Sequence, residues 1–377
     1  MRLMARSVMV VLAIGGCSSD GSSSTTSDGG GDAVEAVDCT ASTSNLEKAI
    51  CQANGFLGTL TADAATANPT FANVATRTKW SNLPGTARAG VKIGSLNATS
   101  QAAALALMAT VLSEAGVADL TGVRNADDYL ATQGGSSGGG DEGAGPYGAA
   151  NYYLAIVGIP STTGNWAIMF GGHHMAYNLT YVNGVAYPTP SHLGVEPKAS
   201  FTINDGTFMP MADEGAAMVA VFKALDATAL NTAYLQNQTF TDVLIGPVEY
   251  GAGSSALAKA KFPTGDNRTG VLVSSLTADQ QALVSAAIRQ WVADYDASIA
   301  TDLLTAYTSA TAYQDTYVAW GGSQASGIDV DVNGFYMRLD GPRLWIEMSC
   351  QAGAVIQGVT HYHSIYRDKS FDYANTL

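Results

Sequence analysis

The chain has 377 residues, of which 18 are lysine or arginine and 32 are aspartate or glutamate, so its formal net charge is −14. An acidic chain without an evident basic patch repels phosphate backbones, which argues against nucleic acid as a partner. The length exceeds that of a typical domain, but neither an internal repeat nor a second linker is evident along the chain. We therefore expect one large domain, or two closely packed halves.

The first residues have the layout of an export signal. Arg2 and Arg6 precede an apolar run over 8–14, which is too short to span a membrane, and small residues then lead to Cys17. This order predicts a lipoprotein signal peptide over 1–17, with Cys17 as the lipidated residue; a plain secretory signal is the alternative. Removing residues 1–16 takes away two arginines and no acid, which moves the charge from −14 to −16.

The segment after Cys17 is dominated by Ser, Thr, Gly and Asp, so we expect a flexible tether over 18–38 and a single domain over 39–377. Either signal predicts an extracytoplasmic protein. It is either held at the cell envelope by a lipid anchor, at the outer membrane in a Gram-negative host, or secreted. In an oxidising compartment Cys39 and Cys51 can close a short loop, leaving Cys350 free, but spacing alone does not decide the pairing.

The first third of the domain is predicted to be helical. Ser44-x-x-Glu47 is a capping-box pattern before an apolar stripe, and a second helix is expected over 99–114. The glycine-dense segment 134–145 lacks the Lys-Ser/Thr ending of a phosphate loop and is expected to be a surface loop.

The rest of the domain alternates between strand and helix patterns. Residues 152–159 and 166–182 are rich in aromatic and branched residues and predict strands, with Asn183-Gly184 as a hairpin turn. Helices are expected after Pro210 and after Thr277-x-x-Gln280. Four further strands are expected at 317–320, 335–339, 344–348 and 359–366. This order predicts an α+β fold, with a helical N-terminal third followed by a mostly antiparallel sheet with packed helices.

The five histidines fall into three short segments, and this clustering is the most informative feature of the sequence. On a strand, His361 and His363 point to the same face, and two imidazoles on one face suit a divalent transition metal. His173 and His174 are adjacent, so a regular strand would direct only one of them to that face unless Gly171-Gly172 forms a bulge. We expect His174 to be a ligand and His173 to orient it.

Ionisable residues on neighbouring strands are the candidates for catalysis. Glu347 lies in an apolar run and needs a partner if it is buried, and Arg367-Asp368 follows the second histidine pair. Glu347 or Asp368 would act as the general base or orient a ligand, while a structural salt bridge is the alternative for Glu347. His192 is expected in a loop, where it has no assigned role.

The same residues carry a resemblance to a family. Gly-Gly-His-His at 171–174, the segment 189–197, Arg343-Leu344-Trp345-Ile346-Glu347 and the run 361–368 resemble the bacterial family of unknown function numbered 3500. The resemblance covers nearly the whole predicted domain and extends to the segments around Trp80, Arg88 and 152–161. Members of that family usually carry an apolar or aromatic residue at the position of His192, and often an Asp-Tyr-Gly-like step where this chain has Asp372-Tyr373-Ala374. The resemblance implies no particular reaction.

Three functions are consistent with these patterns. The first is a metal-dependent hydrolase, with His361, His363 and His174 (or His173) holding a divalent transition metal, zinc first, and an open position for water. A copper- or iron-dependent oxidoreductase with the same ligands is the second. The third is a non-enzymatic envelope lipoprotein that binds a metal or a small molecule. A small-molecule substrate or ligand and a lipid anchor to the membrane are the expected partners.

Overall fold

A computed structural model describes residues 37–134, 145–236, 238–246 and 261–377. The predicted signal peptide, Cys17, nearly all of the tether and most of the glycine-dense segment lie outside these residues. The compact unit that contains the described residues runs over 36–377. Within the described ranges, no helix is long and apolar enough to cross a membrane.

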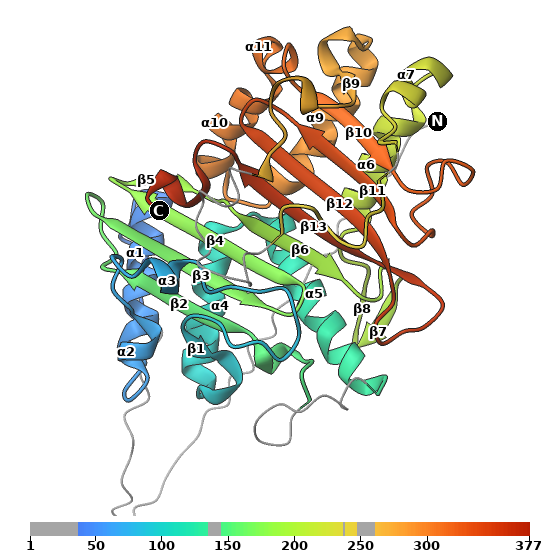
Figure 1. The fold of residues 1–377 in the computed structure, drawn as a ribbon. Helices are drawn as coiled ribbons and strands as arrows, with labels where there is room; N and C mark the ends of the chain where they lie inside the picture. The colour runs from blue at the N-terminus through green and yellow to red at the C-terminus, as the bar shows by residue number, and fades with distance from the viewer. Residues whose placement is uncertain (1–36, 135–144, 237, 247–260) are drawn as a thin grey trace, which may run out of the picture. The chain divides into compact units, whose positions relative to one another are not determined.

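The centre of the unit is an antiparallel sheet in which the described residues form eleven strands (Figure 1). The strands follow one another across the sheet in the order β1-β2-β3-β4-β6-β13-β12-β11-β10-β9, and β5 pairs with the end of β4. Their bounds are β1 Val91–Lys92, β2 Tyr153–Gly158, β3 Asn165–Gly172, β4 Met175–Val182, β5 Val185–Tyr187, β6 Ser191–Val195, β9 Val271–Leu272, β10 Tyr317–Gly321, β11 Phe335–Asp340, β12 Leu344–Ala352 and β13 Thr360–Asp368. A separate hairpin consists of β7 Phe201–Ile203 and β8 Gly206–Phe208.

Helices cover one face of this sheet, and in Figure 1 they lie behind the strands. The large core between them holds Trp291 of the helical layer and Ile346 of β12, both almost fully buried. Burial of this apolar surface is the main stabilising contribution to the fold. The helices are α1 Asn45–Gly58, α2 Ala64–Ala67, α3 Val74–Arg77, α4 Ala98–Val111, α5 Glu114–Thr132, α6 Ala212–Lys223, α7 Ala227–Thr232, α9 Ala278–Val292, α10 Ala297–Thr308 and α11 Ala310–Tyr313, with short 3₁₀ turns η1 Ile93–Ser95, η4 Ala149–Asn151, η5 Gly265–Asn267, η6 Val273–Ser275 and η7 Asp372–Asn375.

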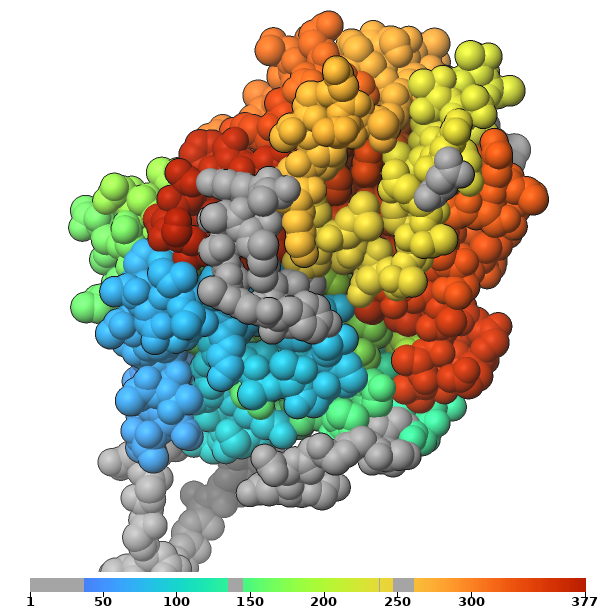
Figure 2. Space-filling view, viewed as in Figure 1, coloured from blue at the N-terminus to red at the C-terminus, as the bar shows by residue number. Residues whose placement is uncertain are grey.

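Loops cover the opposite face of the sheet. A smaller apolar cluster joins Trp80 in the segment before β1 and Val243 in the segment before β9 to Trp345 and Ile365 of the sheet. Figure 2, in the same view, shows the blue and the yellow-to-orange atoms of these two segments lying over the strands. The fold is thus a sheet between a helical layer and a loop layer.

The predicted α+β class is confirmed, and most of the predicted elements are present. Both capping boxes form, with Ser44 and Glu47 at α1 and with Thr277 and Gln280 at α9. The predicted helix over 99–114 is wrong at its end. Helix α4 stops at Val111, and Ser113 caps α5 by accepting a hydrogen bond from the backbone N–H of Gly116.

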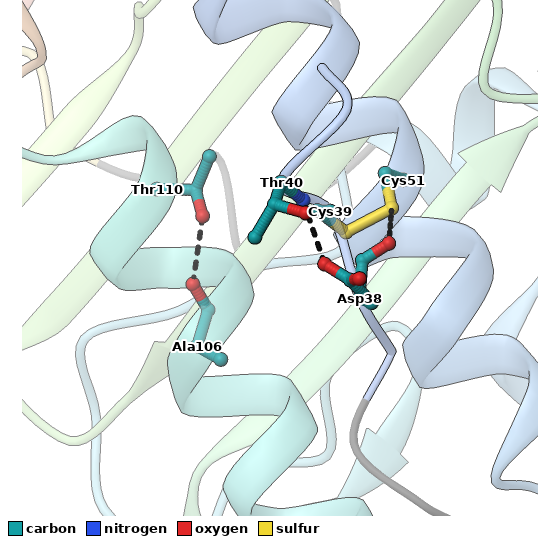
Figure 3. Close-up of a disulfide and its surroundings, with 6 residues drawn as sticks. All are labelled: Asp38, Cys39, Thr40, Cys51, Ala106 and Thr110. Carbon is teal, nitrogen blue, oxygen red and sulfur yellow. Dashed lines mark hydrogen bonds between the residues drawn. A yellow bond between two sulfur atoms is a disulfide. The ribbon is translucent and has the colours of Figure 1, made fainter.

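The sequence left the disulfide pairing open, and the structure joins Cys39 to Cys51 (Figure 3). Cys350 is free and buried in β12. The bond fastens the start of the described chain to α1, which packs beside α4. Burial raises the pKa of the Cys350 thiol to about 12, so this thiol is not a thiolate at neutral pH.

The fold contains an internal repeat that the sequence did not reveal. The strand order is the same when read from either edge: β1-β2-β3-β4 on one side matches β9-β10-β11-β12 on the other, and β6 meets β13 at the centre. The helices repeat as well, because α1 packs on α4 as α6 packs on α9. We call residues 45–195 the first repeat and residues 212–368 the second repeat.

Matching hydrogen bonds support this equivalence. Gly90–Gln101 and Gly270–Gln281 share Gly, Val, Ser, Leu, Ala and Gln at corresponding positions. In both segments the glutamine side chain donates to the leucine carbonyl five residues earlier, at 2.8 Å in one and 3.0 Å in the other. Both glycines have positive φ, and a Cβ at either position would lie within 2.5 Å of a backbone oxygen of the neighbouring strand. Each repeat therefore depends on glycine at the same place.

Candidate metal centre

The first histidine pair lies in a turn and not on a strand. Gly172 of β3 pairs with Met175 of β4, so His173 and His174 are the two turn residues between these strands. His174 has a φ of 62°, a left-handed conformation that costs roughly 1 kcal/mol for a residue with a Cβ. The expected strand or bulge is wrong here, and the turn allows both rings to stand at the same end of the hairpin.

The second pair lies on β13 as predicted. His361 and His363 are two residues apart on this strand, and their Nε2 atoms are 3.2 Å apart. Gly194 of β6 pairs with His363, and a Cβ at this glycine would come within 3.2 Å of both His363 and His174. Glycine at this position therefore allows the His174 ring to reach across β6 toward β13.

His174, His361 and His363 form a group that could hold a metal ion, since one ligand atom from each lies within 4.8 Å of the others. The ring centroids are 4.9 Å apart for His174 and His363 and 5.3 Å apart for His174 and His361. All three residues are buried, with 4–6% of their surface exposed. The group contains His174 and not His173, in keeping with the ligand expected from the sequence.

Two carboxylates fix the orientation of histidines at this site. Asp127 of α5 lies 2.6 Å from Nδ1 of His173, and Asp242 lies 2.9 Å from Nδ1 of His363. A carboxylate accepts hydrogen bonds, so Nδ1 carries the proton in both rings and Nε2 keeps its lone pair. Such outer carboxylates are typical of histidines that bind metals.

Burial favours the neutral form of His174 and His361. Burial, followed by the neighbouring His363 and His173, lowers the pKa of His361 to about 3, and burial and the other imidazoles lower that of His174 well below its ordinary value. Burial raises the pKa of Asp242, but the hydrogen bonds that it accepts from His363 and from the backbone N–H of Val243 oppose this, and its net pKa lies below the ordinary value. Neutral imidazoles with free lone pairs are the form that binds a transition metal.

All five histidines of the chain lie together, because His192 joins the same cluster. It is located on β6 and not in the expected loop, is fully buried, and its ring centroid lies 5.5 Å from that of His363. Its Nδ1 lies 3.3 Å from the carbonyl oxygen of His174, and its Nε2 has no hydrogen-bond partner among the described residues. His192 therefore packs beneath the three-histidine group rather than within it.

Glu347 forms its hydrogen bonds with residues outside the histidine cluster. Its carboxylate is fully buried and accepts hydrogen bonds from Tyr336, Trp345 and the backbone N–H groups of Leu244 and Ile245. The pKa of Glu347 is raised above its ordinary value, because burial outweighs the opposing effect of these four hydrogen bonds. These contacts fasten the segment that carries Asp242 onto the sheet, so Glu347 positions that segment, and its hydrogen-bond partners among the described residues do not include a histidine.

Arg367 and Asp368 lie toward the other end of β13. Arg367 is fully buried, pairs with Asp372 at 2.7 Å and donates to the carbonyl groups of Ile245 and Gly246. Asp368 accepts from Tyr307 and pairs with Arg343 at 2.6 Å. A strand rises about 3.3 Å per residue, so Arg367 starts roughly 13 Å along the strand from His363. The structure does not bring these two residues to the histidine cluster.

Sequence reasoning missed Asp127, Asp242 and the place of His192 in the cluster. Asp127 is one of several acids on α5, and Asp242 lies in a segment without a recognisable pattern. Their proximity to the histidines comes from tertiary packing, and no local signal distinguishes them.

The fold and the site define the class of this protein. It is an α+β protein with an antiparallel sheet and a buried group of three histidines. Residues 42–375 match the family described as "Protein of unknown function (DUF3500)", and the chain belongs to this family. The resemblance seen in the sequence is thereby confirmed. No curated protein and no solved structure matches the chain.

Proposed function

We propose that this protein is an exported metal-dependent hydrolase, with His174, His361 and His363 as ligands of a zinc ion. The observation that carries the proposal is the Nε2–Nε2 distance of 3.2 Å between His361 and His363, with a His174 nitrogen close to both. Two nitrogens bound at 2.0–2.1 Å in tetrahedral geometry are about 3.3 Å apart, so the rings already have the spacing of ligands to a common ion.

The donor set favours zinc over the other metals considered. All three ligands are imidazoles, which suit zinc, copper and iron. Many non-haem iron enzymes bind the metal with two histidines and one carboxylate. Here Asp242 is hydrogen-bonded to Nδ1 of His363, so it orients a ligand and is not itself a ligand, which makes iron less suitable. A copper oxidoreductase remains the second candidate, and oxygen-dependent turnover would distinguish it.

Bound zinc would lower the pKa of a coordinated water and polarise a substrate carbonyl or similar group. His173 is the residue of this chain best suited to move the proton, since its ring stacks on His174 at 3.7 Å between centroids. Asp127 holds its Nδ1–H, which leaves Nε2 free to accept a proton from an attacking water. We assign the general base to His173, because Glu347 and Asp368 are engaged elsewhere.

Export is supported by chemistry outside the site. The described chain contains a disulfide, and such bonds persist mainly in oxidising compartments outside the cytoplasm. We propose that residues 1–17 are a lipoprotein signal, that Cys17 carries the lipid, and that the folded unit works at the cell envelope on a small molecule. The acidic charge argues against nucleic acid as a substrate. A binding protein that retains its ligand without turnover is the non-enzymatic alternative.

The test is metal analysis of the full chain, produced without added metal, beside the His361→Ala/His363→Ala variant. We expect near-stoichiometric zinc in the parent chain and none in the variant. His173→Gln should keep the metal but lose most hydrolysis in a screen of small esters and amides, whereas Glu347→Asp should not lose zinc. Absence of zinc, copper and iron from the parent chain, with no uptake from solution, would contradict the proposal.

A further inference from the structure

A second group of ionisable side chains lies away from the histidines, where the two repeats meet. Asp119 is on α5, Glu214 is in the first turn of α6, and Asp294 follows the end of α9. One carboxylate oxygen from each lies within 4.8 Å of the others. Glu214 and Asp294 are 4% and 2% exposed, and Asp119 is half-buried.

Backbone contacts hold the three acids together. The N–H of Ser113, which caps α5, donates to the carbonyl of Asp294 at 2.7 Å, and this joins the first turn of α5 to the α9–α10 connection. The N–H of Met211 at the start of α6 lies 3.3 Å from Asp119. The cluster therefore follows from the way the repeats pack and does not depend on mobile side chains.

No positive partner compensates this charge. Among the described residues, no lysine, arginine or histidine forms an ion pair with any of the three carboxylates. Burial, together with repulsion from Asp213, raises the pKa of Asp119 to about 6, and burial with repulsion from Asp119 and Asp213 raises that of Glu214 to about 8. Buried acids in this situation need either protons or a cation.

An independent observation is the phenol of Tyr177 on β4. This side chain is 1% exposed, and its hydroxyl has no hydrogen-bond partner in the described part of the chain. After burial, the charges that raise its pKa most are those of Asp294 and Asp119, followed by Tyr295 and Glu214, so the phenol lies near all three acids. A buried hydroxyl without a partner indicates a missing ligand or water.

The cluster is also accessible. A cavity of about 310 Å³ lies beside it, and its lining includes Asp119, Asp213, Glu214 and Gln290. An ion, with the waters that complete its coordination, can therefore reach Asp119 and Glu214 from solvent.

We propose that Asp119, Glu214 and Asp294, with the hydroxyl of Tyr177 directly or through water, form a calcium site that joins the two repeats. Carboxylate and hydroxyl oxygens are the ligands of hard cations. Calcium binds oxygens at 2.3–2.6 Å, so two ligands of one calcium ion lie no more than about 5 Å apart, and three carboxylate oxygens within 4.8 Å of one another can share one ion. Magnesium requires shorter bonds and a stricter octahedron.

The experiment is thermal unfolding of the full chain, freed of metal with a chelator and then titrated with calcium chloride or magnesium chloride. At a hundredfold excess over the dissociation constant we expect calcium to raise Tm by about 5 °C. The rise should be absent in Asp294→Asn and Glu214→Gln. Asp302→Asn is the matched control, because Asp302 occupies the position of Asp119 in the second repeat, on α10, and is exposed.

Two outcomes would overturn the proposal. The first is a Tm that does not respond to calcium while Asp294→Asn raises the Tm of the chelated protein, which would show that the acids are protonated. The second is an equal response in parent and variants, which would place calcium elsewhere. The His361→Ala/His363→Ala variant should keep the calcium response, so failure of the zinc site and failure of this site are distinguishable.

Discussion

The turn between β3 and β4 and the turn between β11 and β12 occupy equivalent places in the two repeats. In both, a turn carbonyl accepts a 2.7 Å backbone hydrogen bond: His174 accepts from Gly194 of β6, and Arg343 accepts from Lys369, the residue after β13. The first turn carries His173 and His174, whereas the second carries Pro342 and Arg343. The same turn position therefore carries imidazole side chains in the first repeat and a proline and an arginine in the second.

The two central strands differ in the same way. By the pairing with β4 and β12, His192 of β6 corresponds to Arg367 of β13, and both side chains are fully buried. Arg367 binds Asp372 and two carbonyl groups, whereas Nε2 of His192 has no partner among the described residues. At this pair of positions the second repeat uses an arginine to fasten the loop layer, whereas the first repeat places an imidazole with an unpaired nitrogen. The same fold position therefore carries different chemistry in the two repeats.

The largest effect is expected when the turn histidine is replaced. His174→Gly should weaken zinc binding by more than about 100-fold, because loss of a ligand exceeds the 10–100-fold effect of outer residues. Glycine adopts the positive φ of this turn without strain, so the metal-free protein should not lose stability. Arg343→Ala, at the equivalent turn, is the control and should leave affinity unchanged in calorimetric titration. An equal loss of zinc affinity in both variants would contradict the assignment of metal binding to the first turn alone.

The repeat itself predicts a matched pair of destabilising changes. Gly90→Ala and Gly270→Ala should each lower the free energy of unfolding by roughly 2–4 kcal/mol, because a Cβ at either place meets the carbonyl oxygen of the next strand. Denaturant unfolding measures both values. Gly58→Ala is the control, since a Cβ there meets nothing within 4 Å. A large loss of stability in only one of the two variants would argue against the structural equivalence of the two repeats.

Acid should destabilise the metal-free protein through its buried histidines. The pKa values of His192 and His361 are about 3 in the folded protein, below the value of about 6.5 for an unfolded chain. The unfolded chain therefore takes up protons first, so stability is fully present above pH 6.5 and is lost as the pH falls toward 3. His192→Gln should flatten this dependence in urea unfolding of the chelated protein, and an unchanged slope would argue against a buried neutral His192.

The smallest effect concerns the C-terminal turn, which has no counterpart in the first repeat. Ala374 has a φ of 55°, where the resembling family often carries glycine. Ala374→Gly removes left-handed strain but increases the entropy of the unfolded chain, so we expect a gain of only about 0.5–1 kcal/mol. The midpoint of urea unfolding should rise. A lower midpoint would show that the methyl group of Ala374 makes a contact that stabilises the fold by more than the left-handed strain costs.

The sequence predicted features that depend on local patterns. The capping boxes predicted α1 and α9, alternation predicted β13 with His361 and His363 on one face, and Asn183-Gly184 predicted the turn before β5, where both residues have positive φ. The turn at His173 and His174 was missed because it lacks the usual turn residues. The repeat was missed because its clear sequence likeness is confined to the short segments beginning at Gly90 and Gly270.

The features that could not be predicted depend on packing between distant segments. Asp127 and Asp242 reach the histidines from α5 and from the loop layer, and neither has a spacing that links it to them. Asp119, Glu214 and Asp294 likewise lie far apart in the chain and meet only through the contact between the repeats.

The most direct test of the central claim is anomalous X-ray scattering from crystals of the full chain, recorded above and below the zinc absorption edge. We expect one strong zinc peak about 2.0–2.1 Å from Nε2 of both His361 and His363 and in bonding contact with the His174 ring. Ordered histidines without any metal peak, even after the crystals are soaked in zinc, would show that the 3.2 Å contact is a hydrogen bond between imidazoles and would contradict the proposed zinc site.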